Sequence, residues 1–91
     1  MELKLNESKT LIYIGETEEN KEAYVSFTEN NGILTIRHIF VDPKFRGQGI
    51  SGKLLVELTD YVRKNNFKIT SMCGYSTSWL LNHEEYKDLL V

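Results

Sequence analysis

The sequence predicts an α/β or α+β fold in which a mixed β-sheet packs against one principal helix. Three observations predict it. The first 41 residues alternate apolar and polar side chains between turn signals, which is typical of strands. Residues 50–64 carry apolar side chains at helical spacing, and another apolar stretch, Phe67–Met72, follows them. At 91 residues, 41% of them hydrophobic, we expect residues 1–91 to form a single domain.

The N-terminal part of the chain predicts an antiparallel meander of four strands. The expected strands are a short one around Leu3–Leu5, then Thr10–Gly15, Ala23–Thr28 and the long Ile33–Val41. Asn31 and Gly32 form a strong hairpin signal between the last two strands. Asp42 and Pro43 end the fourth strand, because proline has no N–H to donate to a sheet and restricts the residue before it.

The next part of the chain predicts a crossover helix and a fifth strand. The helix is expected from residue 49 or 50 to about Lys64, with apolar residues at 50, 54, 55, 58, 61 and 62. Because this helix lies between them, the strands Ile33–Val41 and Phe67–Met72 are expected to be parallel.

Short C-terminal helices are expected after the fifth strand. Ser76 is a residue type that caps helices, and we expect it to precede a short helix carrying Trp79–Leu81. Glu84–Leu90 is expected to form a last turn or two.

Charge is unevenly distributed along the chain. The net charge is −4 over residues 1–36, +4 over 37–68 and −2 over 69–91. A basic middle in an acidic protein suits a compact anionic ligand better than a long polyanion, although a solvated helix face gives the same pattern. We therefore expect no nucleic acid partner.

Composition excludes several other classes of protein. No stretch approaches the roughly eighteen apolar residues of a membrane span, and no leader opens the chain, so we expect a cytoplasmic protein with no membrane partner. The chain has one cysteine, Cys73, which excludes an internal disulfide and a cysteine-rich zinc site.

The most informative segment is the glycine-containing stretch VDPKFRGQGISGKLL, residues 41–55. Gly47, Gly49 and Gly52 lie just before and inside the first turn of the predicted helix. Glycine there lets backbone N–H groups approach an anion, and the helix N-terminus adds unpaired donors and a favourable dipole. Gly52 needs a reason, because glycine destabilises a helix. A loop that merely needs positive φ angles is the alternative interpretation.

Two nucleotide-binding motifs match this segment by letter only. Residues 47–53 fit G-x-x-x-x-G-K, but Leu54 stands where a P-loop needs Ser or Thr for magnesium. Residues 47–52 fit G-x-G-x-x-G, but four residues separate Asp42 from Gly47 and the next strand ends without an acidic residue. Both interpretations are disfavoured.

The whole segment resembles a known family. Arg46–Ser51 resembles the R/Q-x-x-G-x-G/A signature of the GNAT superfamily of acetyl-CoA-dependent acetyltransferases, and residues 41–45 resemble the lead-in to that signature. A closer resemblance is to a small GNAT-like subfamily of acetyl-CoA-binding proteins. It rests on His38, the Arg46–Gly49 loop, Cys73–Tyr75 and His83–Tyr86, and spans about residues 33–90. The sequence departs from these patterns at Ser51, where Gly or Ala is usual, and at Gly74, where proline is frequent.

The resemblance implies a fold and a cofactor site. The fold is a minimal GNAT-like one, a mostly antiparallel mixed sheet whose fourth and fifth strands are parallel and splayed around one main helix, with short C-terminal helices. The cofactor is acetyl-CoA. The residues expected to hold its diphosphate are Arg46, Gly47, Gln48, Gly49, Ile50 and Ser51, the first through its side chain and the others through backbone amides. Backbone groups of Ile39, Phe40 and Val41 are expected to bind pantetheine and to polarise the acetyl carbonyl.

His38 and Cys73 are the candidate catalytic residues for attack of an amine on the thioester. A histidine is a suitable base at neutral pH, and alternation along the strand places His38 on the face of Ile36 and Phe40. The alternative is a structural histidine, hydrogen-bonded within the sheet. Cys73 is expected near the cofactor sulfur, where it donates a proton, accepts the acetyl group or simply packs as a small apolar residue.

Other polar side chains are weaker candidates. Tyr75 could supply an acid but is expected to be a packed or exposed aromatic residue. His83 is expected to have a structural role. A zinc site of Cys73, His38 and His83 is disfavoured, because it would need three scattered ligands.

The resemblance implies an N-acetyltransferase-like protein that transfers acetyl from acetyl-CoA to an unidentified amine, a small molecule such as a polyamine or a protein lysine. The alternative is a non-catalytic acyl-CoA-binding or sensing module, and a small interaction domain without a cofactor is a third. Phe40, where some relatives carry a carboxylate, favours the module, whereas His38 and Cys73 favour the enzyme. The helices and strands that build the acceptor pocket of larger GNAT enzymes have no counterpart here. We therefore expect an acceptor side that is open, formed by a partner such as a second subunit in a homodimer, or absent.

Overall fold

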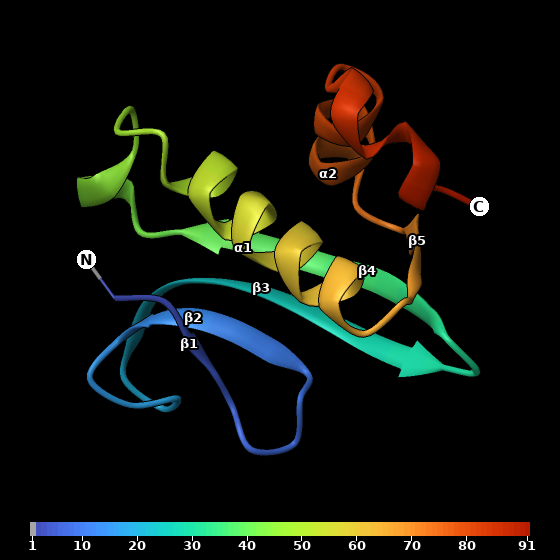
Figure 1. Ribbon diagram of the computed structural model, residues 1–91. Coiled ribbons are helices and arrows are strands. Elements are labelled where there is room, and N and C mark those ends of the chain that lie inside the picture. Colours follow the sequence, from blue (N-terminus) through green and yellow to red (C-terminus); the bar gives the residue numbers. More distant parts are fainter. Residues whose placement is uncertain (1) are drawn as a thin grey trace.

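A five-stranded sheet carries one long helix along one of its faces (Figure 1). The computed structural model describes residues 2–91, and the strands follow one another across the sheet in the order β1-β2-β3-β4-β5. The elements are β1 Lys4–Leu5, β2 Leu11–Gly15, β3 Lys21–Asn30, β4 Ile33–Val41, the 3-10 helix η1 Pro43–Phe45, α1 Ile50–Lys64, β5 Lys68–Ser71, α2 Gly74–Leu81 and the 3-10 helix η2 Glu84–Leu89. Strands β1 to β4 pair antiparallel and β5 pairs parallel to β4, which confirms the predicted mixed sheet.

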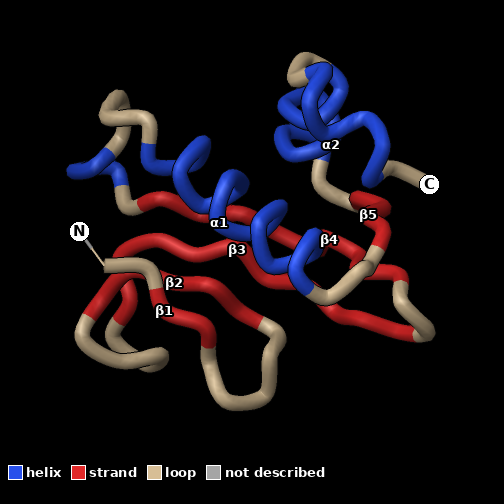
Figure 2. The backbone as a smooth tube through the Cα atoms, in the orientation of Figure 1, coloured by secondary structure: helices blue, strands red, loops and turns tan. Residues whose placement is uncertain are grey.

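Helix α1 lies over one face of the sheet (Figure 2), and the core fills the space between that face and the apolar side of the helix. The helix buries the apolar residues that its spacing predicted, Ile50, Leu54, Leu55, Leu58 and Val62. They pack against the inward side chains of the central strands, among them Val25, Phe27, Leu34 and Ile36. Within residues 2–91, no helix has the length and apolar character needed to cross a membrane.

A β-bulge interrupts the pairing of β3 with β4. Ser26 pairs with His38 and Phe27 with Ile36, so Arg37 is an extra residue on β4. Arg37 and His38 are both exposed as a result, whereas Ile36 on one side and Ile39 on the other both pack toward the core. The prediction that His38 shares a face with Ile36 is therefore wrong. Phe40, the other residue predicted to lie on the same face as His38, does lie there.

The C-terminal part differs from the prediction at two boundaries. The fifth strand is shorter than predicted, Lys68–Ser71, because the chain turns at Cys73 into α2. Ser76 does not cap that helix. Cys73 is the N-cap residue, with extended backbone, and its carbonyl accepts hydrogen bonds from the N–H and the hydroxyl of Thr77 at 2.9 and 3.0 Å. Ser76 is therefore buried inside the first turn of α2.

Candidate functional site

Strands β4 and β5 separate halfway along β4. Their pairing ends at Ile36, whose carbonyl accepts a hydrogen bond from the N–H of Met72 at 2.8 Å. The remaining residues of β4 have no strand beside them on that side among residues 2–91. On the other side of the strand end, the N–H of Asp42 donates to the backbone carbonyl of Glu22 in β3 at 2.8 Å. Alternation along β4 therefore turns the backbone groups of Ile39 and Val41 toward the gap between β4 and β5.

The same alternation turns the backbone groups of Phe40 away from the gap. Phe40 pairs with Tyr24 of β3, and its side chain lies on the sheet face opposite α1, with its ring centroid 5.7 Å from that of Tyr24. Of the three backbone positions predicted to bind pantetheine, Ile39 and Val41 face the gap and Phe40 faces β3.

The loop after β4 is fixed by local hydrogen bonds. The carboxylate of Asp42 accepts a hydrogen bond from Lys44 N–H at 3.0 Å, and Pro43 starts the 3-10 turn η1. The Arg46 guanidinium Nε then donates to the carbonyl of Val41 at 3.2 Å, so this cation is held at the end of β4.

Gly47 and Gly49 adopt positive φ angles of 82° and 74°. Other residues are strained in this conformation. A Cβ atom at either position would meet no other atom within 4 Å, so the space beside both glycines is open. Both explanations of these glycines are therefore consistent with the structure. The backbone requires glycine for its conformation, and the absence of a side chain leaves room for a ligand close to the backbone.

This loop and the start of α1 border a cavity of about 260 Å³. The first backbone N–H of α1 bonded within the helix is that of Lys53, which donates to Gly49. The N–H groups of Ile50, Ser51 and Gly52 thus have no acceptor within the helix, and the first turn carries no acidic residue. Unpaired amides and the helix dipole make this cavity a suitable anion site.

Most of the residues predicted to hold a diphosphate line this cavity. They are Arg46, Gly47, Gly49, Ile50 and Ser51, joined by Val41 from β4 and Tyr75 from α2. Ile50 is buried in the core and offers the cavity only its backbone. Gln48, also predicted, is exposed and does not line the cavity.

Cys73 lies across the gap from β4. Its backbone is held by the Ser71 hydroxyl, which accepts from Cys73 N–H at 3.2 Å and donates to Cys73 C=O at 3.0 Å. Burial raises the pKa of the thiol. Polar groups that face the sulfur outweigh burial and leave the pKa below its ordinary value. They are the hydroxyl of Ser76 and the backbone N–H groups of Ser76, Tyr75 and Ile39. The structure thus brings Cys73 and Ile39 together.

Ser76 is the residue of this site that the sequence analysis assigned wrongly. Its side chain is fully buried, and its hydroxyl forms no well-oriented hydrogen bond with any residue of the described chain. It does influence the Cys73 sulfur, whose anionic form it stabilises. The spacing C-x-x-S at the start of a helix is the signal that could have identified it, since the N-cap side chain faces the third residue of the first turn.

Replacing Ser76 with alanine is expected to raise the pKa of the Cys73 thiol, because the thiolate loses a donor. The measurement is the rate of alkylation of Cys73 by iodoacetamide as a function of pH. The midpoint should move to higher pH, so the variant reacts more slowly than the parent below the midpoint and equally fast above it. Ser78→Ala, at an exposed position of α2, is the control. An unmoved midpoint would contradict the contact between hydroxyl and sulfur.

His38 and His83 occupy different environments. His38 is exposed on the face opposite α1, 5.8 Å from the Tyr24 ring between centroids, and within residues 2–91 its imidazole forms no hydrogen bond. This argues against a histidine fixed within the sheet. His83 stacks on Trp79 with 3.9 Å between ring centroids, and its Nδ1 lies 2.6 Å from the Trp79 carbonyl. These contacts give His83 a structural role. In the described chain no three potential ligands gather as a metal site.

Comparison with known proteins identifies the family. The profile of the family described as GCN5-related N-acetyl-transferase matches residues 12–89. The solution structure of a GCN5-like, proposed N-acetyltransferase from Staphylococcus aureus is 31% identical, with a TM-score of 0.81 over 99% of this chain and 87% of that chain.

Two larger proteins of Escherichia coli share the fold. A GNAT family N-acetyltransferase in complex with CoA is 22% identical with a TM-score of 0.57, over 67% of this chain and 38% of that one. The ribosomal-protein-S18-alanine N-acetyltransferase is 21% identical with a TM-score of 0.59, over 67% of this chain and 39% of that one. No curated protein sequence matches the chain. The profile match and the structure from Staphylococcus aureus show that the chain belongs to the GCN5-related N-acetyltransferase (GNAT) family.

Proposed function

We propose that residues 1–91 act as one acetyl-CoA-binding domain that transfers the acetyl group to an amine. The observation that carries this proposal is a continuous path along the end of β4. It runs from the unpaired amides at the start of α1 to the gap beside Ile39, where the Cys73 sulfur lies. The first end suits a diphosphate and the second suits a thioester.

The loop 46–51 fits the diphosphate of acetyl-CoA. Two negative phosphates would meet the N–H groups of Ile50 and Ser51 and the Arg46 guanidinium, with no acidic residue in the first turn of α1 to oppose them. The open space beside Gly47 and Gly49 lets phosphate oxygens reach the backbone. The coenzyme supplies a thioester whose carbonyl carbon is open to attack.

The gap beside β4 fits pantetheine, which carries amide groups along its length. The C=O group of Ile39 and the N–H group of Val41 would bind these amides, much as a neighbouring strand would. The other two backbone groups are already engaged, because the Val41 carbonyl accepts from Arg46 and the Ile39 N–H faces the Cys73 sulfur. Phe40 has no such role, because its backbone faces β3. Once the Cys73 sulfur has attacked the carbonyl and lost its charge, the N–H of Ile39 would donate to the acetyl oxygen, where negative charge develops, an interaction commonly worth about 3 kcal/mol.

In the proposed reaction Cys73 is the nucleophile and His38 is the general base. The Cys73 thiolate attacks the acetyl carbonyl, a new carbon–sulfur bond forms, and CoA leaves as a thiolate that takes a proton from water. A neutral amine then attacks the acetylated cysteine and forms the amide, while His38 accepts the proton that the amine loses. The bond to the cysteine sulfur breaks, and the Cys73 thiolate is regenerated. The donors around the sulfur favour this covalent route, because they stabilise its anionic form.

The acceptor is proposed to be an amine, either a small molecule or a protein lysine, that reaches the gap from the face carrying His38. No helix of the described chain covers this face. The same openness supports the second candidate function, a non-catalytic acyl-CoA-binding module, since an enclosed acceptor pocket is missing from residues 2–91. Release of thiol from acetyl-CoA in the presence of a panel of amines and peptides separates the two functions.

Replacing His38 with alanine is expected to lower turnover by about 100-fold, the contribution of a positioned base, while CoA affinity stays close to that of the parent. Thiol release with the best amine of the panel measures turnover, and calorimetry measures affinity. Arg37→Ala, at the exposed bulge position next to it, is the control. Equal activity of the two variants would exclude His38 as the base.

A further inference from the structure

The Cys73 sulfur lies at the start of α2, where polar groups of the first helical turn face it. The first backbone N–H bonded within this helix is that of Thr77, which donates to the Cys73 carbonyl. The N–H groups of Gly74, Tyr75 and Ser76 thus have no acceptor within the helix, and the first turn carries no acidic residue. Negative charge on the sulfur, or on an atom bonded to it, is therefore stabilised by amides and by the helix dipole.

The Ser76 hydroxyl is a second and independent feature of this position. It is fully buried and has no well-oriented hydrogen bond within residues 2–91, although it faces the Cys73 sulfur. A buried hydroxyl without a good partner costs free energy, so packing alone does not explain a serine here. A sulfur atom is a weak acceptor, whereas an oxygen atom bonded to that sulfur would be a good one. The orphaned hydroxyl therefore fits an oxidised form of Cys73.

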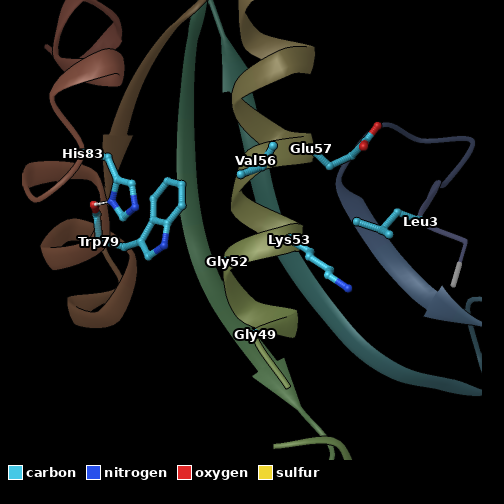
Figure 3. A pocket seen from close by; sticks show the side chains of 8 residues that line it. All are labelled: Leu3, Gly49, Gly52, Lys53, Val56, Glu57, Trp79 and His83. Atoms are coloured by element: carbon cyan, nitrogen blue, oxygen red, sulfur yellow. Dashed lines mark hydrogen bonds between the residues drawn. The ribbon is translucent and has the colours of Figure 1, made fainter. Parts of the chain in front are cut away.

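Helix α2 is anchored at both ends, so these donors are fixed in place. At its start the Ser71 hydroxyl bonds to the N–H and C=O groups of Cys73. Farther along, Trp79 stacks on His83, and both rings border a cavity of about 520 Å³ over the outer side of α1 (Figure 3). A Cβ atom at Gly52 would lie 3.6 Å from Nε1 of Trp79, so a side chain longer than alanine would displace the indole. Close packing of the two helices thus gives a reason for this glycine.

The exposure of Cys73 and the composition of the chain suit a reversible oxidation. Cys73 is half-buried, so a small molecule can reach its sulfur. Thiolates beside helix N-termini are the cysteines that hydroperoxides oxidise. Cys73 is also the one cysteine of the chain, so a sulfenic acid formed on it cannot close an internal disulfide. The oxidised form therefore persists until an external thiol reduces it.

We propose that Cys73 is a modification site at which a small hydroperoxide forms a sulfenic acid, whose oxygen accepts a hydrogen bond from the Ser76 hydroxyl. The thiolate attacks the outer oxygen of the hydroperoxide, a sulfur–oxygen bond forms and the oxygen–oxygen bond breaks. The sulfur is oxidised and the hydroperoxide is reduced, because its inner oxygen leaves with the electron pair of the broken bond and takes a proton from water. The amides of α2 and the Ser76 hydroxyl stabilise the charge that moves onto oxygen.

Oxidation switches off the proposed acetyl transfer, and only this consequence rests on the proposed function. A sulfenic acid has no thiolate with which to attack the acetyl carbonyl. Dithiothreitol reverses the change. One of its thiols attacks the oxidised sulfur and the sulfur–oxygen bond breaks, with the oxygen leaving as water. Its other thiol then breaks the mixed disulfide and releases the Cys73 thiolate.

Trapping with dimedone tests the modification site in the protein without ligand. With dimedone present during treatment with hydrogen peroxide, mass spectrometry should find an adduct on Cys73. Dithiothreitol added after the peroxide and before the dimedone should abolish it, and Cys73→Ser should show none. Absence of the adduct from the parent protein, at a pH where the thiol is ionised, would overturn the proposal.

The Ser76→Ala variant tests the hydrogen bond to the new oxygen. Above the midpoint of alkylation both proteins carry a thiolate, so iodoacetamide should react with them equally fast. Hydrogen peroxide should still oxidise the variant about tenfold more slowly, the effect of one hydrogen bond to a charged group. Ser78→Ala should be oxidised at the parental rate. Equal rates of oxidation in Ser76→Ala and the parent would refute the role of the hydroxyl.

The Ser76→Cys variant tests the same contact by a gain of chemistry. It places a second thiol where the hydroxyl faces the sulfur, in the C-x-x-C spacing of disulfide oxidoreductases. The new thiol should attack the sulfenic acid and expel its oxygen as water, so peroxide should give an internal disulfide in place of the dimedone adduct. An undiminished adduct in this variant would contradict the approach of the two side chains.

The failures of the two proposals differ. If the sulfenic acid forms on Cys73 while acetyl transfer continues undiminished, the nucleophilic role of Cys73 is refuted and the modification site stands. If acetyl transfer depends on Cys73 while peroxide leaves its thiol unchanged, the modification site is overturned and the proposed function stands.

Discussion

Replacing Gly49 with glutamate is expected to weaken CoA binding by about 100-fold or more, because like charges forced together cost several kcal/mol. The carboxylate would stand at the N-cap of α1, beside the amides that we assign to the diphosphate. Glycine also holds a φ of 74° there, which a glutamate adopts only with strain. The measurement is the increase in melting temperature caused by CoA. This increase should disappear in the variant.

The chain offers a matched control for this experiment in Gly32. This glycine has a φ of 84°, and a Cβ atom there would also meet nothing within 4 Å. It lies in the turn between β3 and β4, at the other end of β4 from the loop. Gly32→Glu therefore adds the same charge and a similar strain away from the site, and should leave the response to CoA intact. A normal response in Gly49→Glu would remove the loop from the proposed site.

Replacing Cys73 with alanine is expected to reduce acetyl transfer by about 1,000-fold or more, as the loss of an activated nucleophile does in other enzymes. CoA affinity should change little, because the loop that we assign to the diphosphate is untouched. Turnover is followed by thiol release, and affinity by calorimetry. In the parent protein, mass spectrometry after treatment with acetyl-CoA should find one acetyl group on Cys73, removable by hydroxylamine.

The Cys73→Ser variant separates nucleophilic catalysis from packing. Serine has nearly the size of cysteine, so a packing role would be preserved in it and the activity retained. A nucleophilic role would be lost, since the groups that face this position are donors, which stabilise a thiolate but do not ionise a hydroxyl. Parental turnover in Cys73→Ala, with no acetylated cysteine, would exclude the covalent route in favour of direct transfer to the amine.

The fold could be predicted from the sequence because its signals are local. The strands and α1 follow from apolar spacing, and the parallel pairing of β4 with β5 follows from the helix between them. The bulge at Arg37 was missed although the sequence contains its signal. Two polar residues, Arg37 and His38, stand side by side between apolar positions, which shifts the alternation by one residue. A prediction that extends one alternation through the whole strand therefore places His38 on the wrong face.

The site could be predicted only in part, because much of it depends on contacts between distant segments. The loop 46–51 is one continuous motif and was recognised as such. The approach of Cys73 to Ile39 depends on where β5 ends and on how α2 begins. Ser76 lies beside them because α2 has Cys73 as its N-cap residue, three residues before the serine that was expected to cap it. The cavity over the outer side of α1 is lined by both Leu3 and Trp79, which lie far apart in the sequence.

The bulge at Arg37 has a consequence for how the protein behaves among its own copies. The separation of β4 from β5 leaves main-chain groups unpaired along the second half of β4, and such edges recruit strands from other molecules and lead to aggregation. A bulge twists the strand locally and places a charged side chain at its start, so a foreign strand cannot lie flat along it. The bulge in β4 thus hinders a neighbouring chain from pairing with this edge, while it leaves free the space that we propose for pantetheine.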